Sequence, residues 1–181
     1  MPINHRFAKY LNLACLMLIA AGLSACSRTI SFEEEVEIAN GRKVVIKRST
    51  QFERSCEGFS CGWRLSQSSI RSSDVPISEW AEKMWPMVLV VSNTGDLVLI
   101  ALRPMCEGPR YRQYVSKNNK WNEMPLDKAY FDTTANLLMS VGEEHVKLPI
   151  RVEAVYRIKE NNAPGFPGYV RTVSPQIRDN C

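Results

Sequence analysis

The sequence contains few of the residues on which enzyme active sites most often depend. Only two of its 181 residues are histidines, His5 and His145. Hydrolases usually place a histidine base beside a nucleophile, and no G-x-S-x-G elbow presents a serine in this sequence. His145, in the stretch G-E-E-H-V-K, therefore fits a surface or packing residue better than a base, and we expect no catalytic residues.

Patterns that bind metals or nucleotides are missing as well. His145 has no second histidine to join it, and the acidic residues show no ligand-loop spacing. Neither a phosphate-binding loop nor a dinucleotide fingerprint occurs in the chain. We therefore expect no metal and no cofactor apart from the covalent lipid considered below.

Long hydrophobic runs are missing too. The longest apolar stretch, residues 10–22, is interrupted by Asn12 and as a helix would reach about 20 Å, against roughly 30 Å of bilayer hydrocarbon. It follows a segment that carries Arg6 and Lys9 but no acid, and it ends in small residues. A positive start, a short apolar core and a small-residue end are typical of an export signal.

This signal closes with the stretch Leu23-Ser24-Ala25-Cys26, which resembles the lipobox of bacterial lipoproteins. The resemblance implies that diacylglycerol joins the Cys26 sulfur, that the chain is cut before Cys26, and that the new amino group is acylated. Two or three acyl chains hold a protein firmly at a bilayer. Ser27 is not the aspartate associated with inner-membrane retention, which favours the periplasmic face of the outer membrane. The alternative is an ordinary secretory peptide cut near Ala25.

Charge and composition describe the rest of the chain as one domain. Setting residues 1–25 aside lowers the net charge from +4 to +2, too little to indicate nucleic-acid binding. No Pro/Gly/Ser-rich linker, repeat or second composition regime follows. We expect a signal peptide over 1–25, a lipid anchor and short tether over 26–29, and a single β-rich globular domain over 30–181.

Cysteine usage predicts two disulfides. Four of the six cysteines remain once Cys15 in the signal and the lipidation residue Cys26 are set aside: Cys56, Cys61, Cys106 and Cys181. An even number in an exported domain is typical of paired cysteines, with three possible pairings. We favour Cys56–Cys61, because Gly58 helps to turn the chain in C-E-G-F-S-C, which leaves Cys106–Cys181. Zinc is the competing interpretation, but the spacing lacks a C-x₂₋₄-C pair at both ends.

Alternation of apolar and polar residues predicts strands paired as hairpins. Residues 30–38 and 44–52 flank Asn40-Gly41, the pair best suited to a type I′ turn. Residues 87–91 and 97–102 are continuous apolar runs, typical of a central hairpin buried on both faces. Further strands are expected over residues 110–115, 120–124, 136–141 and 169–173.

Helical signals are fewer. The serine-rich residues 64–85 suggest a loop in which residues 78–82 open a short helix, and a single helical turn is expected near Asp127. Pro149 suits the first turn of a helix over residues 149–160. The expected fold class is mainly β (α+β): an antiparallel sheet or sandwich built from hairpins, with one late helix.

Three consecutive glutamates are the most unusual feature of the first strand. Glu33 and Glu35 share a face about 7 Å apart, a separation that a glycosidase pair can have. On an exposed strand they are more typical of a charged edge that discourages aggregation. Glu34 points with the apolar residues, so it lies at the sheet margin or pairs with one of three cations: Arg42, Lys43 or Arg48.

Aromatic and basic residues give weaker indications. The four tryptophans are scattered, which favours packing over stacking on cell-wall sugars: Trp63, Trp80, Trp85 and Trp121. Six basic residues lie near the anchor in the sequence, where contact with anionic headgroups would orient the domain: Arg28, Arg42, Lys43, Lys47, Arg48 and Arg54.

Several stretches resemble a group of exported bacterial proteins for which no activity is implied. They are F-E-E-E-V-E-I-A-N-G-R-K-V-V-I-K-R, K-W-N-E-M-P-L, A-N-L-L and H-V, and the resemblance extends over residues 32–181. We expect a lipid-anchored cell-envelope protein with a non-enzymatic binding or structural role, whose partner is an envelope protein or the cell wall. The alternatives are a hydrolase acting on the cell wall or on lipid, and a membrane-tethered inhibitor of a secreted enzyme.

Intact mass spectrometry of the mature protein tests the cysteine assignment. Alkylation without reduction should add no mass, because Cys56, Cys61, Cys106 and Cys181 are all expected to be paired. Alkylation after reduction should modify all four. A mass gain before reduction would reveal a free thiol and contradict the two-disulfide prediction.

Overall fold

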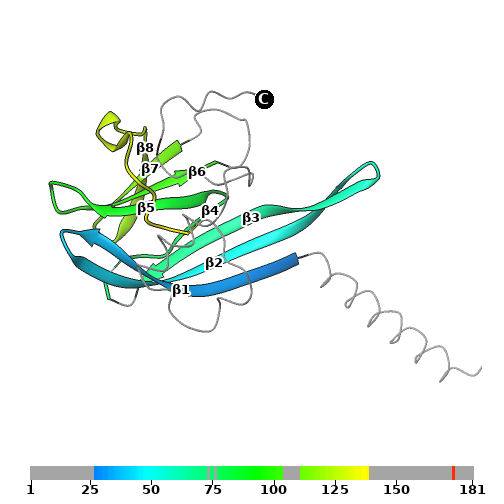
Figure 1. Ribbon diagram of the computed structural model, residues 1–181, viewed down its shortest axis with the longest axis horizontal. Helices are drawn as coiled ribbons and strands as arrows, with labels where there is room; N and C mark the ends of the chain where they lie inside the picture. The colour runs from blue at the N-terminus through cyan, green and yellow to red at the C-terminus, as the bar shows by residue number, and fades with distance from the viewer. Residues whose placement is uncertain (1–26, 73, 76, 104–110, 139–172, 174–181) are drawn as a thin grey trace, which may run out of the picture.

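The computed structural model describes residues 27–72, 74–75, 77–103, 111–138 and 173. Within these ranges eight strands form two four-stranded antiparallel sheets, ordered β1-β2-β3-β4 and β5-β6-β7-β8 (Figure 1). Consecutive strands pair with one another in both sheets, so the predicted mainly β architecture built from hairpins is confirmed. The predicted helix over 149–160 lies outside the described residues, as do residues 139–141 and 169–172 of two predicted strands.

The first sheet contains three long strands, β1 (Ser27–Ala39), β2 (Arg42–Glu57) and β3 (Ser60–Ser72), and one short strand, β4 (Trp80–Glu82). The strand β1 starts before the predicted Ile30, and Ser27 already pairs with Glu53 of β2. Residues 27–29, expected to form a tether, therefore belong to the sheet.

Two local predictions for the first sheet are wrong. The serine-rich residues 64–72 form part of β3 because their partners in β2 supply backbone hydrogen bonds and the strand buries Leu65 and Ile70. Residues 80–82, expected to be helical, form β4, in which Trp80 is buried opposite Ile70. Tertiary burial of these side chains overrides the local preferences of serine and of the S-E-W-A-E stretch.

The second sheet comprises β5 (Trp85–Val91), β6 (Leu97–Leu102), β7 (Tyr111–Lys117) and β8 (Lys120–Met124). Every residue of β6 is buried, as predicted for this hairpin, but the hairpin is not central because β5 lies at the edge of the sheet. Between β7 and β8, Asn118 and Asn119 both have positive φ, 52° and 59°, as a type I′ turn requires.

The turn between β1 and β2 differs from the predicted geometry. Gly41 has a φ of 76°, whereas Asn40 does not adopt a positive φ, so the turn is not type I′. A bulge between Glu37 and Ala39 shifts the register just before the turn. The Glu37 carboxylate accepts a hydrogen bond from the Gly41 N–H at 3.0 Å, which holds this alternative turn in place.

Two apolar clusters lie on opposite faces of the second sheet. The cluster between the sheets contains residues from both: Val36, Ile38, Val44, Ile46, Ile70, Trp80, Met84, Leu89, Leu97, Leu99, Ala101, Tyr114 and Leu137. The other face of β5–β7 packs against Leu126, Tyr130, Phe131, Ala135 and Val173. The predicted helical turn near Asp127 is confirmed as a 3₁₀ turn, Lys128–Tyr130, whose first turn is capped by the Asp127 side chain.

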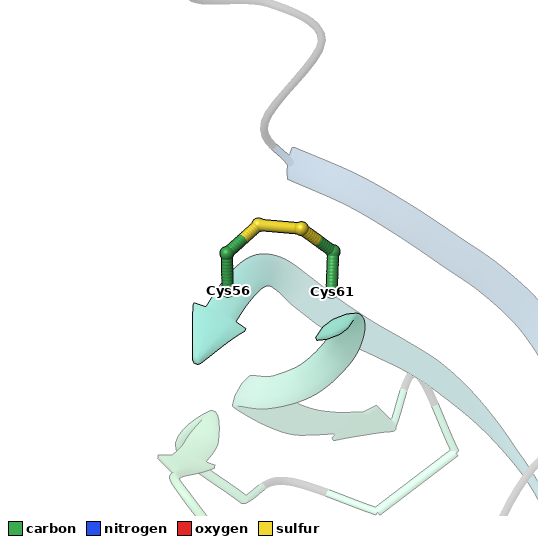
Figure 2. Close-up of a disulfide and its surroundings, with 2 residues drawn as sticks. All are labelled: Cys56 and Cys61. Carbon is green, nitrogen blue, oxygen red and sulfur yellow. A yellow bond between two sulfur atoms is a disulfide. The ribbon is translucent and has the colours of Figure 1, made fainter. Parts of the chain in front are cut away.

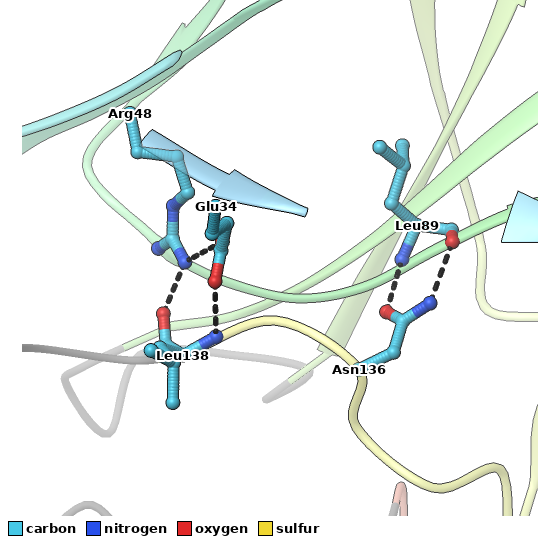
Figure 3. A network of polar contacts seen from close by, with 5 residues as sticks. All are labelled: Glu34, Arg48, Leu89, Asn136 and Leu138. Carbon is cyan, nitrogen blue, oxygen red and sulfur yellow. Dashed lines mark hydrogen bonds and ion pairs between the residues drawn. The ribbon is translucent and has the colours of Figure 1, made fainter. Parts of the chain in front are cut away.

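Asn136 joins the edge strands of the two sheets. Its amide oxygen accepts from the Leu89 N–H at 2.9 Å, and its amide nitrogen donates to the carbonyls of Leu89 at 2.8 Å and Glu37 at 2.9 Å (Figure 3). The side chain thus pairs with the edge of β5 as a backbone would, and also reaches β1. Residues 136–138 are not a strand, contrary to the prediction. Their contacts to the edge of β5 come from the Asn136 side chain and from one backbone bond, in which the Leu137 N–H donates to the Met87 carbonyl at 2.9 Å.

Glu34 and Arg48 form an ion pair inside the sandwich. Both side chains are fully buried, and an Arg48 Nη1–H donates to the Glu34 carboxylate at 2.7 Å. The second carboxylate oxygen accepts from the Leu138 N–H at 3.2 Å, and Arg48 also donates to the Leu138 carbonyl (Figure 3). Of the three cations expected as partners of Glu34, Arg48 is the one that pairs.

Removing one member of this pair should destabilise the protein strongly. We expect Glu34→Leu to lower the free energy of unfolding by about 3–5 kcal/mol, because the Arg48 charge stays buried without its counterion. Adding Arg48→Met should recover part of that loss, because no uncompensated charge then remains. Denaturant unfolding followed by circular dichroism measures both.

Glu33→Leu is the matched control for this prediction, since Glu33 pairs with Lys47 at 3.3 Å on the exposed side of the same strand. Its cost should stay within about 1 kcal/mol. Equal losses for the Glu33 and Glu34 variants would contradict the importance of the buried pair.

Candidate functional site

The residues singled out from the sequence fall into two groups. Cys26, Cys106, His145 and Cys181 lie outside the described residues, so their predicted roles stay predictions. Cys56 and Cys61 are joined by a disulfide, with an S–S distance of 2.06 Å and Cα atoms 4.0 Å apart (Figure 2). The favoured local pairing of the two is therefore present.

Glu33 and Glu35 lie on the outer face of the first sheet. Glu33 is 3.3 Å from the Lys47 ammonium and Glu35 is 3.8 Å from that of Lys43, as expected for acidic residues facing basic ones across a hairpin. A glycosidase pair requires one carboxylic acid desolvated in a cleft. Here each carboxylate lies beside a lysine on the charged face of the sheet, with 37% of the Glu33 side chain and 13% of the Glu35 side chain exposed.

Three of the four tryptophans pack against the sandwich. Trp80 is buried and meets Tyr114 edge-on, with ring centroids 5.5 Å apart. Trp85 contacts Phe52 at 5.9 Å between centroids, and Trp121 donates its indole N–H to the Ser78 carbonyl at 2.9 Å. These contacts bear out the packing interpretation for three of the tryptophans. Trp63 differs, because 48% of it is exposed.

Among the described residues, one strongly perturbed titrating group belongs to the core. Burial raises the pKa of Tyr114 to about 12, and the charges of Glu123 and Glu82 add to the effect. The Tyr114 hydroxyl donates to the Met84 sulfur at 3.2 Å. A neutral phenol held against a thioether is a packing residue. Across the described ranges, no three histidine, cysteine or acidic side chains gather as metal ligands would.

The β2–β3 hairpin extends beyond the rest of its sheet. The strand β1 ends its pairing at Ser27, opposite Glu53, while β2 and β3 continue to a turn at Gly58 and Phe59 (Figure 1). The start of β1 and the end of this hairpin lie on the same side of the molecule. We call residues 53–64 the hairpin tip.

A bulge gives the hairpin tip two different faces. Opposite Gln51 and Phe52, the strand β3 contains one extra residue, Ser66, so its alternation reverses there. Leu65 consequently faces the interior beside Phe52, and Trp63 follows on the same face. Without the bulge, Arg64 would take that face in place of Trp63.

The face that carries Trp63 is the apolar one. Arg54 pairs in register with Trp63, and the Cys56–Cys61 disulfide forms the next row toward the turn on this face. The opposite face is polar: Arg64 makes an ion pair with Glu57, and the Ser66 hydroxyl donates to Glu53 at 2.7 Å. The tip is therefore a two-stranded ribbon with an apolar side and a charged side.

The turn places an aromatic ring at the extreme end of the tip. Gly58 has a φ of 58°, which suits the first central position of a type II′ turn. Phe59 follows at the second central position and is fully exposed. The disulfide closes the ribbon immediately before this turn (Figure 2).

A buried polar row separates the hairpin tip from the apolar core. Along the inward face of β2, Val44 and Ile46 are followed by Arg48 and then Thr50, all buried. Thr50 pairs in register with Ser68 of β3, which is buried too. The tip thus lies beyond a polar boundary and adds little to the packing of the sandwich.

Sequence reasoning missed this projecting hairpin because the serines of β3 indicated a loop. The signal was nevertheless present: alternate positions in C-G-W-R-L are apolar, as are the first and last positions of F-E-R-S-C, on either side of the E-G-F-S turn. Two alternating segments closed by a disulfide and a Gly-containing turn are typical of a hairpin.

Comparisons with known proteins do not assign this chain to a family. No family model, curated protein or solved structure matches the chain. Among the residues that the structure describes, none form a helix with the length and apolar character needed to cross a membrane.

The disulfide should hold the hairpin tip together. We expect Cys56→Ser/Cys61→Ser to speed amide hydrogen exchange over residues 54–63 and to lower the free energy of unfolding by at most about 2 kcal/mol, the chain-entropy value for so short a loop. Exchange in β6 should stay protected, because the tip lies beyond the core. Ser55→Ala is the control; unchanged exchange at the tip in the double variant would contradict this role.

Proposed function

We propose that this protein is a lipoprotein of the bacterial cell envelope that binds another envelope component without catalysing a reaction. The proposal places it on the periplasmic face of the outer membrane, held by acyl chains on Cys26. The observation that carries it is the stretch Leu23-Ser24-Ala25-Cys26, which follows a positive start and a short apolar run.

The start of β1 supports a close attachment. Ser27 is already paired with Glu53, and the Cα atoms of consecutive residues are only about 3.8 Å apart. Acyl chains on Cys26 would therefore connect directly to a sheet, without a flexible tether between them. The domain would lie against the bilayer and keep a restricted orientation.

The charged residues of the first sheet favour binding over hydrolysis. Glu33 and Glu35, on which the hydrolase hypothesis depended, each lie beside a lysine on the sheet surface. A partner in the envelope, either a protein or the cell wall, accords with an anchored domain of this kind. Fold alone does not identify that partner.

Cys26→Ser tests the attachment. We expect this variant to accumulate as an uncleaved precursor or as a soluble product, because no thiol is available for diacylglycerol; fractionation and intact mass measure this. Cys15→Ser, in the signal itself, should mature normally and serves as the matched control. Crosslinking in intact cells should capture a defined partner that is lost in Cys26→Ser. Normal cleavage and membrane partition of Cys26→Ser would overturn the proposal.

A further inference from the structure

The hairpin tip exposes more aromatic surface than any other described part of the molecule. Phe59 is fully exposed and Trp63 is 48% exposed; the other large exposed apolar residue of the described chain is Met124 in β8. Two exposed aromatic side chains at one end of a disulfide-closed hairpin indicate a contact surface.

The tip extends past the residue that would carry lipid. Gly58 at the turn lies five positions beyond Glu53, the partner of Ser27, which is about 17 Å of strand. The first residue of β1 and the tip lie on the same side of the molecule (Figure 1). A bilayer attached next to Ser27 is therefore within reach of the tip, because β1 is paired from its first residue.

We propose that the apolar face of the hairpin tip inserts into the lipid headgroup region as a second membrane contact beside the anchor. This inference rests on the proposed attachment at Cys26. The occupant of the exposed aromatic face is thus the bilayer to which the same chain is attached, and the two contacts together fix how the sandwich stands on the membrane.

The chemistry of the two faces matches a bilayer interface. Tryptophan is enriched at the level of the headgroups because its ring is apolar and its N–H is polar. Arg54 lies in register with Trp63 on that face, and an arginine there would pair its guanidinium with lipid phosphate while its aliphatic stem stays in the apolar layer. The ion pair between Arg64 and Glu57 occupies the opposite face, which would remain in water.

The disulfide reduces the conformational entropy that the hairpin tip loses when it binds the bilayer. The Cys56–Cys61 bond and the tight turn hold Phe59 and Trp63 in place before any lipid is met. A preformed surface loses less conformational freedom on binding than a flexible loop does. Lipid attachment raises the effective concentration of the bilayer at the tip, so even a weak insertion is populated.

Quenching of Trp63 by brominated lipid measures the insertion. The mature lipidated protein is reconstituted into phosphatidylethanolamine/phosphatidylglycerol vesicles with and without bromine on the acyl chains, and flotation reports attachment in the same samples. We expect bromine to quench the wild-type fluorescence. Trp63→Phe should lose most of this quenching, while Trp121→Phe, which removes a tryptophan of the second sheet, should retain it.

The outcomes separate this inference from the proposed function. Protein that floats with the vesicles but shows equal quenching in wild type and Trp63→Phe would overturn tip insertion and leave the anchor standing. Protein that carries no lipid and does not float would overturn the anchor itself. Both tryptophan variants keep the disulfide and the core, and circular dichroism confirms that they fold.

Replacing Phe59 with a photo-crosslinking residue tests what the hairpin tip contacts in intact cells. We expect adducts with lipid, identified by mass, because the ring at position 59 lies among the headgroups. A discrete protein adduct in place of lipid would overturn the inference and assign the tip to a protein partner.

Discussion

The buried ion pair between Glu34 and Arg48 holds residues 136–138 against the edge strand β1. Each sheet ends in an edge strand, β1 or β5, whose backbone groups need partners. The Leu138 N–H donates to Glu34 and the Leu138 carbonyl accepts from Arg48 Nη1, while Arg48 Nε and Nη2 are buried with no hydrogen-bond partner among the described residues. Asn136 bonds to both edges nearby. A charge pair in the interior is costly unless hydrogen bonds compensate it, and the Leu138 backbone supplies one such bond to each side chain, which holds residues 136–138 beside the pair.

The same strand that contributes Arg48 leads away from the core. In β2 an apolar stretch, a polar row and an aromatic position follow one another before the chain reaches the hairpin tip. The described structure therefore has two parts, a packed body and a projecting ribbon (the hairpin tip), which are stabilised by different interactions. The body is stabilised by burial between two sheets, and the ribbon by one disulfide and its turn.

Much of the sheet architecture could be read from the sequence, because side-chain alternation and Asn/Gly turns are local properties. The β5–β6 and β7–β8 hairpins and the Cys56–Cys61 bond are examples. The extent of β3 and the strand β4 could not, since serines and Trp80 adopt strands there only through neighbours distant in sequence. For Glu34 the pattern identified an anomaly but not its partner, and the bulge at Ser66 that turns Trp63 to the apolar face has no local signature.

The residues that join β1 to residues 136–138 lie far apart in the sequence, and this separation affects the order in which the sandwich is expected to fold. Hairpin contacts join neighbouring strands, whereas Leu138 meets Glu34 across 104 residues and Asn136 meets Glu37 across 99. Closing a large loop costs more chain entropy than closing a small one, and non-local contacts slow folding. We therefore expect the local hairpins to form before the contacts between β1 and residues 136–138 close the sandwich.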